Sequence, residues 1–313
     1  MTDMIGAGKE PSVFKRMLDS DIFHSFKSSP ITMVAAFVVL VMTLAALFAP
    51  LIAPMNPFDP AQVFLMNANI PPRWMNGGDP QFLLGTDDQG RDLYSAILYG
   101  LRVSIFVGVI GVAIACTIGV TLGLVAGFFG GRVDAMIMRI ADVQLTFPAI
   151  LIALLIDGIV RGLLKSATRE DIAFSVLVVS IGLAFWVQYA RTVRGATMVE
   201  RHKEYVQAAR ITGVGALSIM RRHIMPNVLG PVLVLATIQV ATAIITEATL
   251  SFLGVGAPPT SPSLGTLIRI GNDFLFSGEW WITVFPGVML MLISLSINLL
   301  GDWLRDALNP RLQ

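Results

Sequence analysis

Cysteine and charged residues are both scarce in this chain. Of its 313 residues only Cys116 is a cysteine, which excludes an intrachain disulfide framework. Charged residues make up 14% of the sequence and hydrophobic residues 55%, and the mean hydropathy is +0.73. The net charge of +1 provides no basic excess for binding nucleic acid. We therefore expect a lipid-embedded protein without a nucleic-acid partner.

Motifs for catalysis and metal binding are also missing. The sequence has no G-x-x-x-x-G-K-[ST] phosphate loop: Lys9 follows Gly8, but neither the first glycine nor a following Ser or Thr is present. The three histidines, His24, His202 and His223, do not have metal-ligand spacing. We predict that the chain is not an enzyme, that it holds no metal and that it binds no cofactor directly.

Long uncharged runs dominate the sequence instead. A helix needs about 20 residues to cross the hydrocarbon core, far more than a barrel strand. Five runs lack Asp, Glu, Lys and Arg, at residues 28–58, 104–129, 172–190, 223–246 and 280–301. A weaker sixth, near 140–160, contains Asp142, Pro148 and Asp157. These runs predict six transmembrane helices in an all-α membrane protein.

The basic residues predict the orientation of these helices. Residues 191–226 form a polar segment with seven Lys or Arg and two Glu. With six spans and the N-terminus inside, four basic residues before the first span, two in the 130–139 turn, seven in this segment and two near the C-terminus are cytoplasmic, 15 of 22. Removing the weaker span near 140–160, the third in chain order, would place the basic segment outside. Both termini are therefore predicted to be cytoplasmic.

The spans divide the chain into segments. Residues 1–27 are predicted to hold a cytoplasmic helix at the membrane interface, because apolar residues from Val13 to Phe26 recur at helical spacing. Residues 28–53 form the first span, 54–103 an extracytoplasmic segment, and 104–313 a five-helix core. This core includes the cytoplasmic loop 191–226, a second extracytoplasmic segment at 251–281 and a short C-terminal tail.

Two sets of charged residues lie near the predicted outer ends of spans. Asp87, Arg91 and Asp92 belong to a charged turn that leads into a helix. Glu247 lies about 20 residues beyond Pro226, near the outer end of the fifth span, and a carboxylate is costly in lipid. It is expected to face the protein interior or a pathway, in a gating or packing role, with a proton relay as the alternative.

The loop 191–226 has the pattern of a helix, a turn and a second helix. Glu204 and Ala208 are spaced i and i+4, and Ala208 and Ala209 are predicted to form a low-relief exposed face. Gly213 supplies a left-handed residue that ends the first helix. A second short helix flanked by Arg221 and Arg222 precedes Pro226, which begins the next span.

This pattern resembles the EAA loop of the inner-membrane permease subunits of ABC importers. The matching residues are Gln207-Ala208-Ala209, Gly213 and His223-Ile224-Met225-Pro226. Gln207 replaces the motif glutamate, with Glu204 one turn earlier, while His223 and Met225 replace an isoleucine and a leucine. Further matches to the second permease of dipeptide and oligopeptide importers occur at 84–92, 130–134, 138–148, 247–254 and 301–312.

The resemblance implies a type I ABC importer permease fold in the bacterial inner membrane. Implied partners are a homologous permease in a heterodimer, two ABC ATPase subunits that bind ATP-Mg, and a periplasmic or lipid-anchored solute-binding protein. Coupling to an ATPase subunit is then expected at Glu204, Gln207, Ala208, Ala209, Gly213, Met225 and Pro226. Asp87, Arg91, Asp92 and Glu247 are expected to act in gating on the periplasmic side.

The substrate predicted from this resemblance is a di- or oligopeptide. Nickel, glutathione or another small solute remains an alternative within the same family. An ion-coupled secondary transporter would instead predict inverted repeats and a charged relay through the membrane, and no such duplication is visible in the sequence. A membrane receptor or scaffold that does not transport is the third possibility.

Overall fold

A computed structural model describes residues 21–163, 169–258 and 261–308. Within these ranges the chain is almost wholly helical, and its β structure is a single bridge between Thr86 and Asp92. The long helices are α3 (Pro30–Leu47), α5 (Leu93–Phe129), α6 (Gly131–Leu145), α7 (Ala149–Leu163), α8 (Arg169–Glu200), α11 (Met225–Phe252) and α13 (Trp281–Ala307). Shorter ones are α2 (Asp21–Ser28), α4 (Ala49–Ile52), α9 (Glu204–Ile211), α10 (Ala216–Ile219) and α12 (Leu264–Phe274).

Five helical stretches are long and apolar enough to cross a membrane: Pro30–Leu47, Leu93–Phe129, Ala173–Glu200, Ala216–Phe252 and Trp281–Ala307. The predicted span near 140–160 is not one straight helix. It is divided between α6 and α7, which are bent by 96° at the break. Pro148 lies in that break. Its ring disfavours helical backbone at Phe147, and its nitrogen carries no hydrogen to donate to a helical hydrogen bond. A sixth crossing would therefore be this broken pair.

Helix α5 begins within the segment 54–103 that the sequence assigns to the extracytoplasmic side. It starts at Leu93, so residues 93–103 are helical. The start is fixed by Asp92, whose carboxylate accepts hydrogen bonds from the backbone nitrogen of Ser95 at 2.8 Å and from its hydroxyl at 2.6 Å. Of the predicted N-terminal helix, the described part is α2; residues 1–20 lie outside the described residues.

Helices α5 and α8 pack closely through glycines of α5. A methyl group on Gly119 would lie 2.4 Å from the carbonyl oxygen of Trp186, and one on Gly123 would lie 2.6 Å from that of Ala190. Small residues allow backbones in a membrane to approach this closely. The largest apolar cluster is built around this contact and includes Tyr189 and Val193 of α8. The α5–α8 pair is therefore the centre of the bundle.

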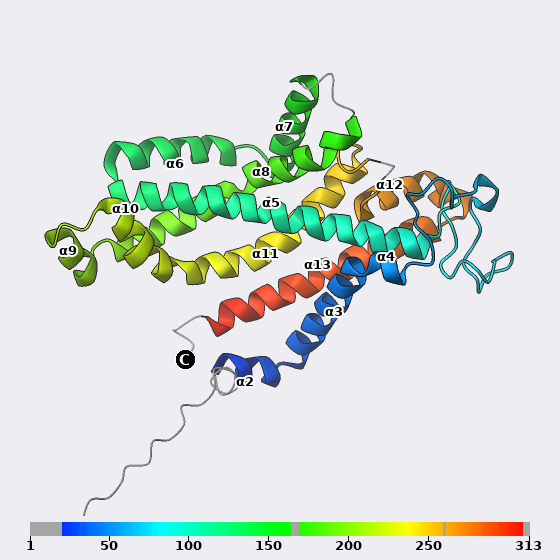
Figure 1. Ribbon diagram of the computed structural model, residues 1–313, viewed down its shortest axis with the longest axis horizontal. Coiled ribbons are helices and arrows are strands. Elements are labelled where there is room, and N and C mark those ends of the chain that lie inside the picture. The colour runs from blue at the N-terminus through cyan, green and yellow to red at the C-terminus, as the bar shows by residue number, and fades with distance from the viewer. Residues whose placement is uncertain (1–20, 164–168, 259–260, 309–313) are drawn as a thin grey trace, which may run out of the picture.

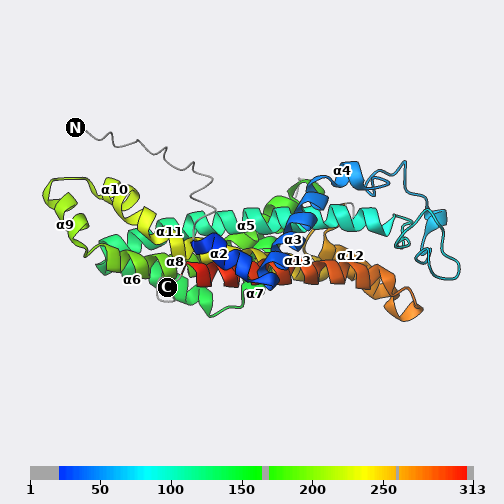
Figure 2. The same cartoon turned by 90° about the horizontal axis from the view of Figure 1, so that it is seen from below.

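The bundle has two distinct ends (Figure 1). Helices α9 and α10 project from one end, and the C-terminal end of α13 and helix α2 point toward the same end. We call this the α9 end. The connection 53–92 and helix α12 gather at the opposite end, here called the α12 end, as Figure 2 also shows. The segments that the sequence assigns to one side of the membrane thus lie at one end of the bundle.

Candidate functional site

The predicted basic loop begins later than the sequence suggested. Arg191 and Arg194 belong to α8, which continues to Glu200, and both pair with carboxylates of α6. Arg191 Nη2 lies 2.5 Å from Asp142 Oδ1, and the Arg194 guanidinium binds both oxygens of Asp134, with Nη2 2.6 Å from Oδ2. Part of the charge assigned to a loop therefore holds α6 against α8.

Helix α9 ends as the sequence predicted. Gly213 has φ +81°, in the left-handed region that glycine adopts without strain. The amide of Gly213 donates to the carbonyl of Arg210 at 3.1 Å, and the amide of Val214 donates to that of Ala209 at 3.0 Å. These two bonds define a Schellman motif, which satisfies the last carbonyls of the helix. The turn therefore directs the chain from α9 into α10.

The two alanines of the motif lie on different faces of α9. Ala208 is exposed, together with Glu204 and Gln207, whereas Ala209 is 8% exposed and belongs to the main apolar cluster. The prediction that both form an exposed low-relief face was wrong for Ala209. Its neighbour on the inner face is Val206, three residues earlier, which is fully buried and shows the helical period.

Gln207 makes a bond that the motif glutamate could not make. Its Nε2 donates to the carbonyl oxygen of Arg201 at 3.1 Å, across the turn between α8 and α9. An ionised carboxylate only accepts hydrogen bonds. In this chain the side chain at the motif position thus stabilises the α8–α9 turn by a hydrogen bond within the chain.

Tyr205 joins α9 to both neighbouring spans. Its hydroxyl donates to the Glu200 carboxylate at the end of α8 and accepts from Asn227 Nδ2 of α11 at 3.0 Å. Lys203 Nζ lies 2.5 Å from the other Glu200 oxygen. Partial removal from water, together with the Glu200 carboxylate, raises the pKa of Tyr205 to about 12. The hydroxyl therefore stays a donor at neutral pH. Because Asn227 is 22 residues away and belongs to another helix, no local pattern could have indicated the link to α11.

The second predicted helix and the following span form one continuous rod. Helix α10 passes into a five-residue π turn, Met220–Ile224, and then into α11. Pro226 occupies the first turn of α11, as predicted, and Met225 is half-buried against the main cluster. Arg221 and Arg222 lie within the π turn, a geometry often found at functional sites.

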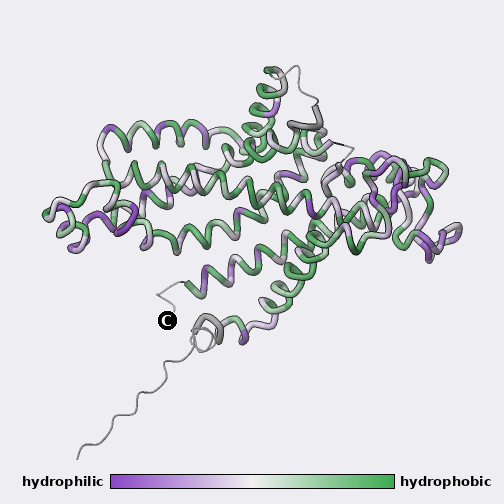
Figure 3. The backbone as a smooth tube through the Cα atoms, in the orientation of Figure 1, coloured by the Kyte–Doolittle hydropathy of each residue, from purple (hydrophilic) through white to green (hydrophobic). Residues whose placement is uncertain are grey.

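The tip of the α9 end exposes large apolar side chains. Ile211 is 87% exposed and Leu217 75% exposed, on either side of the Gly213 turn. Figure 3 shows hydrophilic residues gathered around them at this tip, whereas the middle of the bundle is largely hydrophobic. This tip therefore combines two exposed apolar side chains with a polar surround.

At the α12 end, Asp87 organises a tight charged turn. Its Oδ2 accepts from Arg91 Nε at 2.6 Å, and its Oδ1 accepts from the backbone nitrogens of Gln89 and Arg91, each at 3.0 Å. Asp87 and Arg91 are almost completely buried. Trp281 Nε1 donates to the carbonyl oxygen of Thr86 at 3.2 Å, which ties this turn to the start of α13.

Glu247 lies in a separate, fully buried cluster. Its carboxylate accepts from the hydroxyls of Ser104 and Ser251, each at 2.7 Å. Those hydroxyls accept in turn from the amides of Leu264 at 3.4 Å and Ala257 at 3.1 Å. Ser104 follows Asp92 by 12 residues, about 18 Å of helix. The four residues predicted to act in gating thus form two sites, each joining several segments.

The described residues contain no group of three or more His, Cys, Asp or Glu side chains arranged to hold a metal ion.

Comparison with known proteins places this architecture in a family. Residues 119–313 match the family described as binding-protein-dependent transport system inner membrane component, and residues 20–72 match the N-terminal TM domain of oligopeptide transport permease C. The chain belongs to the former family and is a multi-pass inner-membrane permease of the ABC importer class. Its long apolar helices agree with that location.

Among curated relatives, the chain is 38% identical to the dipeptide transport system permease protein DppC of Haemophilus influenzae, over 94% of this chain and 95% of that one. It is 36% identical to the di/tripeptide transport system permease protein DppC of Pseudomonas aeruginosa, over 97% and 96% of the two chains. The MetNI methionine ABC transporter has a similar fold, with TM-score 0.52 and 18% identity over 68% of this chain and 96% of that one.

Proposed function

We propose that this chain pairs with a second, related permease and that together they form a pathway for short peptides. The support for peptides is the identity to permeases named for dipeptide and di/tripeptide transport, which extends over nearly the whole chain. Two ATPase subunits that bind ATP-Mg and a solute-binding protein complete the complex. In this arrangement the α9 end is cytoplasmic, both termini are cytoplasmic, and the α12 end meets the binding protein.

The observation that carries the coupling proposal is the attachment of α9 to two spans. Its outer face presents Glu204, Gln207 and Ala208, and Ile211 and Leu217 are exposed on either side of the Gly213 turn. The helix is also joined to α8 and α11 through the Tyr205 hydroxyl. An ATPase subunit docked on the outer face would therefore displace both spans when it moves, through packed and hydrogen-bonded contacts.

Direction of transport then follows from differential binding. Closure of the ATPase subunits on ATP favours one arrangement of the spans, and docking of the loaded binding protein at the α12 end favours the same arrangement. The turn around Asp87 and the cluster around Glu247 connect that end to α5, α11, α12 and α13. This chain binds no ATP and contributes the pathway wall and the two docking ends.

Reconstitution of the complete complex in proteoliposomes tests the proposal. Peptide uptake should require ATP and the binding protein. Ala208→Arg, which places a bulky cation on the exposed face of α9, should abolish uptake and binding-protein-stimulated ATP hydrolysis while membrane insertion persists. Ala208→Ser, which keeps a small side chain at the same position, is the matched control and should retain both activities.

Two results would contradict the assignment. Uptake that continues without ATP but stops when the ion gradient is dissipated would indicate a secondary transporter. Full coupling in Ala208→Arg would remove α9 as the ATPase contact.

A further inference from the structure

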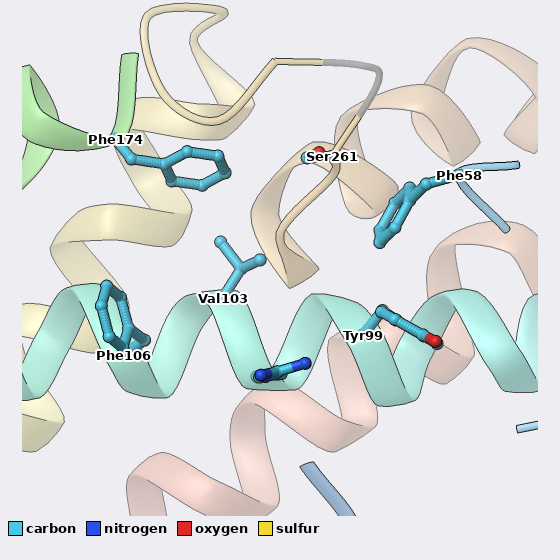
Figure 4. Close-up of a pocket in the computed structure, with 7 residues that line it drawn as sticks. Phe58, Tyr99, Val103, Phe106, Phe174 and Ser261 are labelled. Atoms are coloured by element: carbon cyan, nitrogen blue, oxygen red, sulfur yellow. The ribbon is translucent and has the colours of Figure 1, made fainter. Parts of the chain in front are cut away.

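A pocket of about 460 Å³ lies at the α12 end of the bundle, beside α5 (Figure 4). Its walls come from four segments that are distant in sequence. The residues that line it are Phe58 of the 53–92 connection, Tyr99, Arg102, Val103 and Phe106 of α5, Phe174 of α8 and Ser261 of the connection before α12. In Figure 4 the rings of Phe58 and Phe174 approach the same space from opposite sides, with Val103 between them.

The aromatic wall of this pocket is partly fixed in place. The rings of Phe58 and Tyr99 make an edge-to-face contact with centroids 5.1 Å apart, which joins the 53–92 connection to α5. Pockets for small ligands have volumes of roughly 300 to 1,000 Å³ and walls that are mostly apolar, with a few polar groups that orient the ligand. This pocket has that size and composition.

Arg102 is the charged residue of the pocket, and it is exposed. Among the described residues no carboxylate lies within ion-pair distance of its guanidinium. Asp59, next to Phe58 in the chain, is already occupied: its two oxygens accept from the Ala61 amide and from Gln62 Nε2, each at 3.0 Å. An arginine in the outer turns of a spanning helix extends its guanidinium to the interface or to an anion.

We propose that this pocket receives the carboxyl-terminal residue of a transported peptide, with the carboxylate on Arg102 and an apolar side chain against the aromatic wall. The inference rests on the proposed function. A guanidinium and a carboxylate form paired, charge-assisted hydrogen bonds that fix the orientation of the ligand. A lipid phosphate is also an anion. However, Phe58 and Ser261 belong to connections outside the spans, so part of the pocket wall lies where a peptide arriving at the α12 end would reach it.

Binding of Ala-Phe and of its C-terminal amide to the complete permease–ATPase complex, in lipid nanodiscs without the binding protein, tests the assignment. The binding protein is omitted because any preference it has for a free carboxylate would be measured together with that of the permease. The wild-type complex should bind the acid about tenfold more tightly than the amide, since hydrogen bonds to charged groups have roughly this effect. Arg102→Gln should weaken binding of the acid by about the same factor and abolish the difference between acid and amide.

Two further variants serve as controls. One tests whether any cation at this end of the protein has the same effect as Arg102, and the other tests the apolar wall separately from the carboxylate site. Arg73→Gln removes an exposed cation from the same end of the protein but outside the pocket, and should leave both affinities unchanged. Phe106→Ala should weaken binding of Ala-Phe more than that of Ala-Gly. An acid–amide difference that survives in Arg102→Gln would overturn the proposal.

The lipid source is distinguished by nanodisc composition. If Arg102→Gln changes affinity only in nanodiscs that contain phosphatidylglycerol, and changes it equally for acid and amide, Arg102 serves a lipid phosphate and the proposal fails. Uptake assays keep this failure apart from failure of the proposed function. ATP-dependent uptake of Ala-Phe by the wild-type complex, together with no acid–amide difference, overturns the pocket assignment alone. Absence of such uptake for any peptide contradicts the proposed function itself.

Discussion

Ser104 of α5 and Glu247 of α11 are 143 residues apart in sequence, and the Ser104 hydroxyl donates to the Glu247 carboxylate at 2.7 Å. Both side chains are fully buried, and the same hydroxyl accepts the Leu264 amide at the start of α12. One serine thus links two spans to the helix that covers the α12 end. In this buried cluster the Glu247 carboxylate takes the place of water as the acceptor for the hydroxyls of Ser104 and Ser251.

Removing the Ser104 hydroxyl should destabilise the complex. In Ser104→Ala the Glu247 carboxylate loses one donor and the Leu264 amide loses its acceptor, and leaving buried polar groups unpaired costs about 1 to 3 kcal/mol each. We expect the thermal unfolding midpoint of the nanodisc-embedded complex to fall by several degrees. Ser175→Ala, an exposed serine of α8, is the control and should leave the midpoint unchanged. An equal midpoint in the two variants would show that the cluster around Glu247 contributes no stability.

The cap on α5 makes a prediction about pH. Burial raises the pKa of Asp92 above its ordinary value, and the Ser95 hydrogen bonds only partly oppose this. The folded state therefore takes up a proton at higher pH than the unfolded state. As the pH falls from 7 toward 4, the wild type should gain stability relative to Asp92→Asn, which caps the helix but does not titrate.

The neighbouring Asp88 also has a raised pKa, through burial and the nearby Asp87 carboxylate, but it is present in both proteins and largely cancels. Asp92→Ala should be less stable than Asp92→Asn by about 1 kcal/mol at pH 7, because the alanine leaves the first-turn amide without a partner. Chemical unfolding at several pH values measures both effects. A stability difference between wild type and Asp92→Asn that stays constant from pH 7 to 4 would contradict the pH prediction.

Loss of the Tyr205 hydroxyl should weaken the connection between α9 and the spans. Tyr205→Phe keeps the ring but removes the bonds to Glu200 and Asn227. We expect the complex to assemble and hydrolyse ATP, with fewer peptides imported for each ATP hydrolysed. The measurement is the ratio of uptake to hydrolysis in proteoliposomes, with Tyr94→Phe at the α12 end as the control. If Tyr205→Phe keeps the wild-type ratio, the hydroxyl has no part in coupling.

Replacing Gln207 by the motif glutamate should loosen the turn before α9. Gln207→Glu cannot donate to the Arg201 carbonyl, and it adds a negative charge three residues after Glu204. Amide hydrogen exchange across 200–207 should accelerate by a few-fold, since one net hydrogen bond contributes about 1 kcal/mol. Gln62→Glu in the other large connection should leave that exchange unchanged. Equal exchange in Gln207→Glu and the wild type would show that the amide does not hold the turn.

Run length and charge predicted the helices well, because only a helix satisfies its own backbone over 20 apolar residues. Three details depended on contacts that one sequence does not display. Pro148 marked a break but could not give its 96° bend. Arg191 and Arg194 were interpreted as loop residues, whereas in the structure they form ion pairs with carboxylates of α6. Ala209 turned inward because α9 packs against the end of the bundle, which sets the rotation of the helix.

In the candidate sites too, local backbone features were predictable and contacts between helices were not. Gly213 and Pro226 were predictable because each has a local backbone preference that the structure uses. The contacts of Tyr205 with Asn227 and of Glu247 with Ser104 were not, because each joins two helices. The Arg102 pocket was missed for the same reason: its walls converge from four segments, and no spacing along the chain indicates them.

The π turn at Met220–Ile224 has a consequence for insertions and deletions in this region. It adds about one residue to the helical count between the tip of the α9 end and α11. Deleting a residue there would turn Leu217 by about 100° around the axis of the rod and shorten the rod by 1.5 Å. A docked ATPase subunit would then face different side chains although no residue at the tip had been replaced. Selection on this segment should therefore tolerate many substitutions and reject changes in its length.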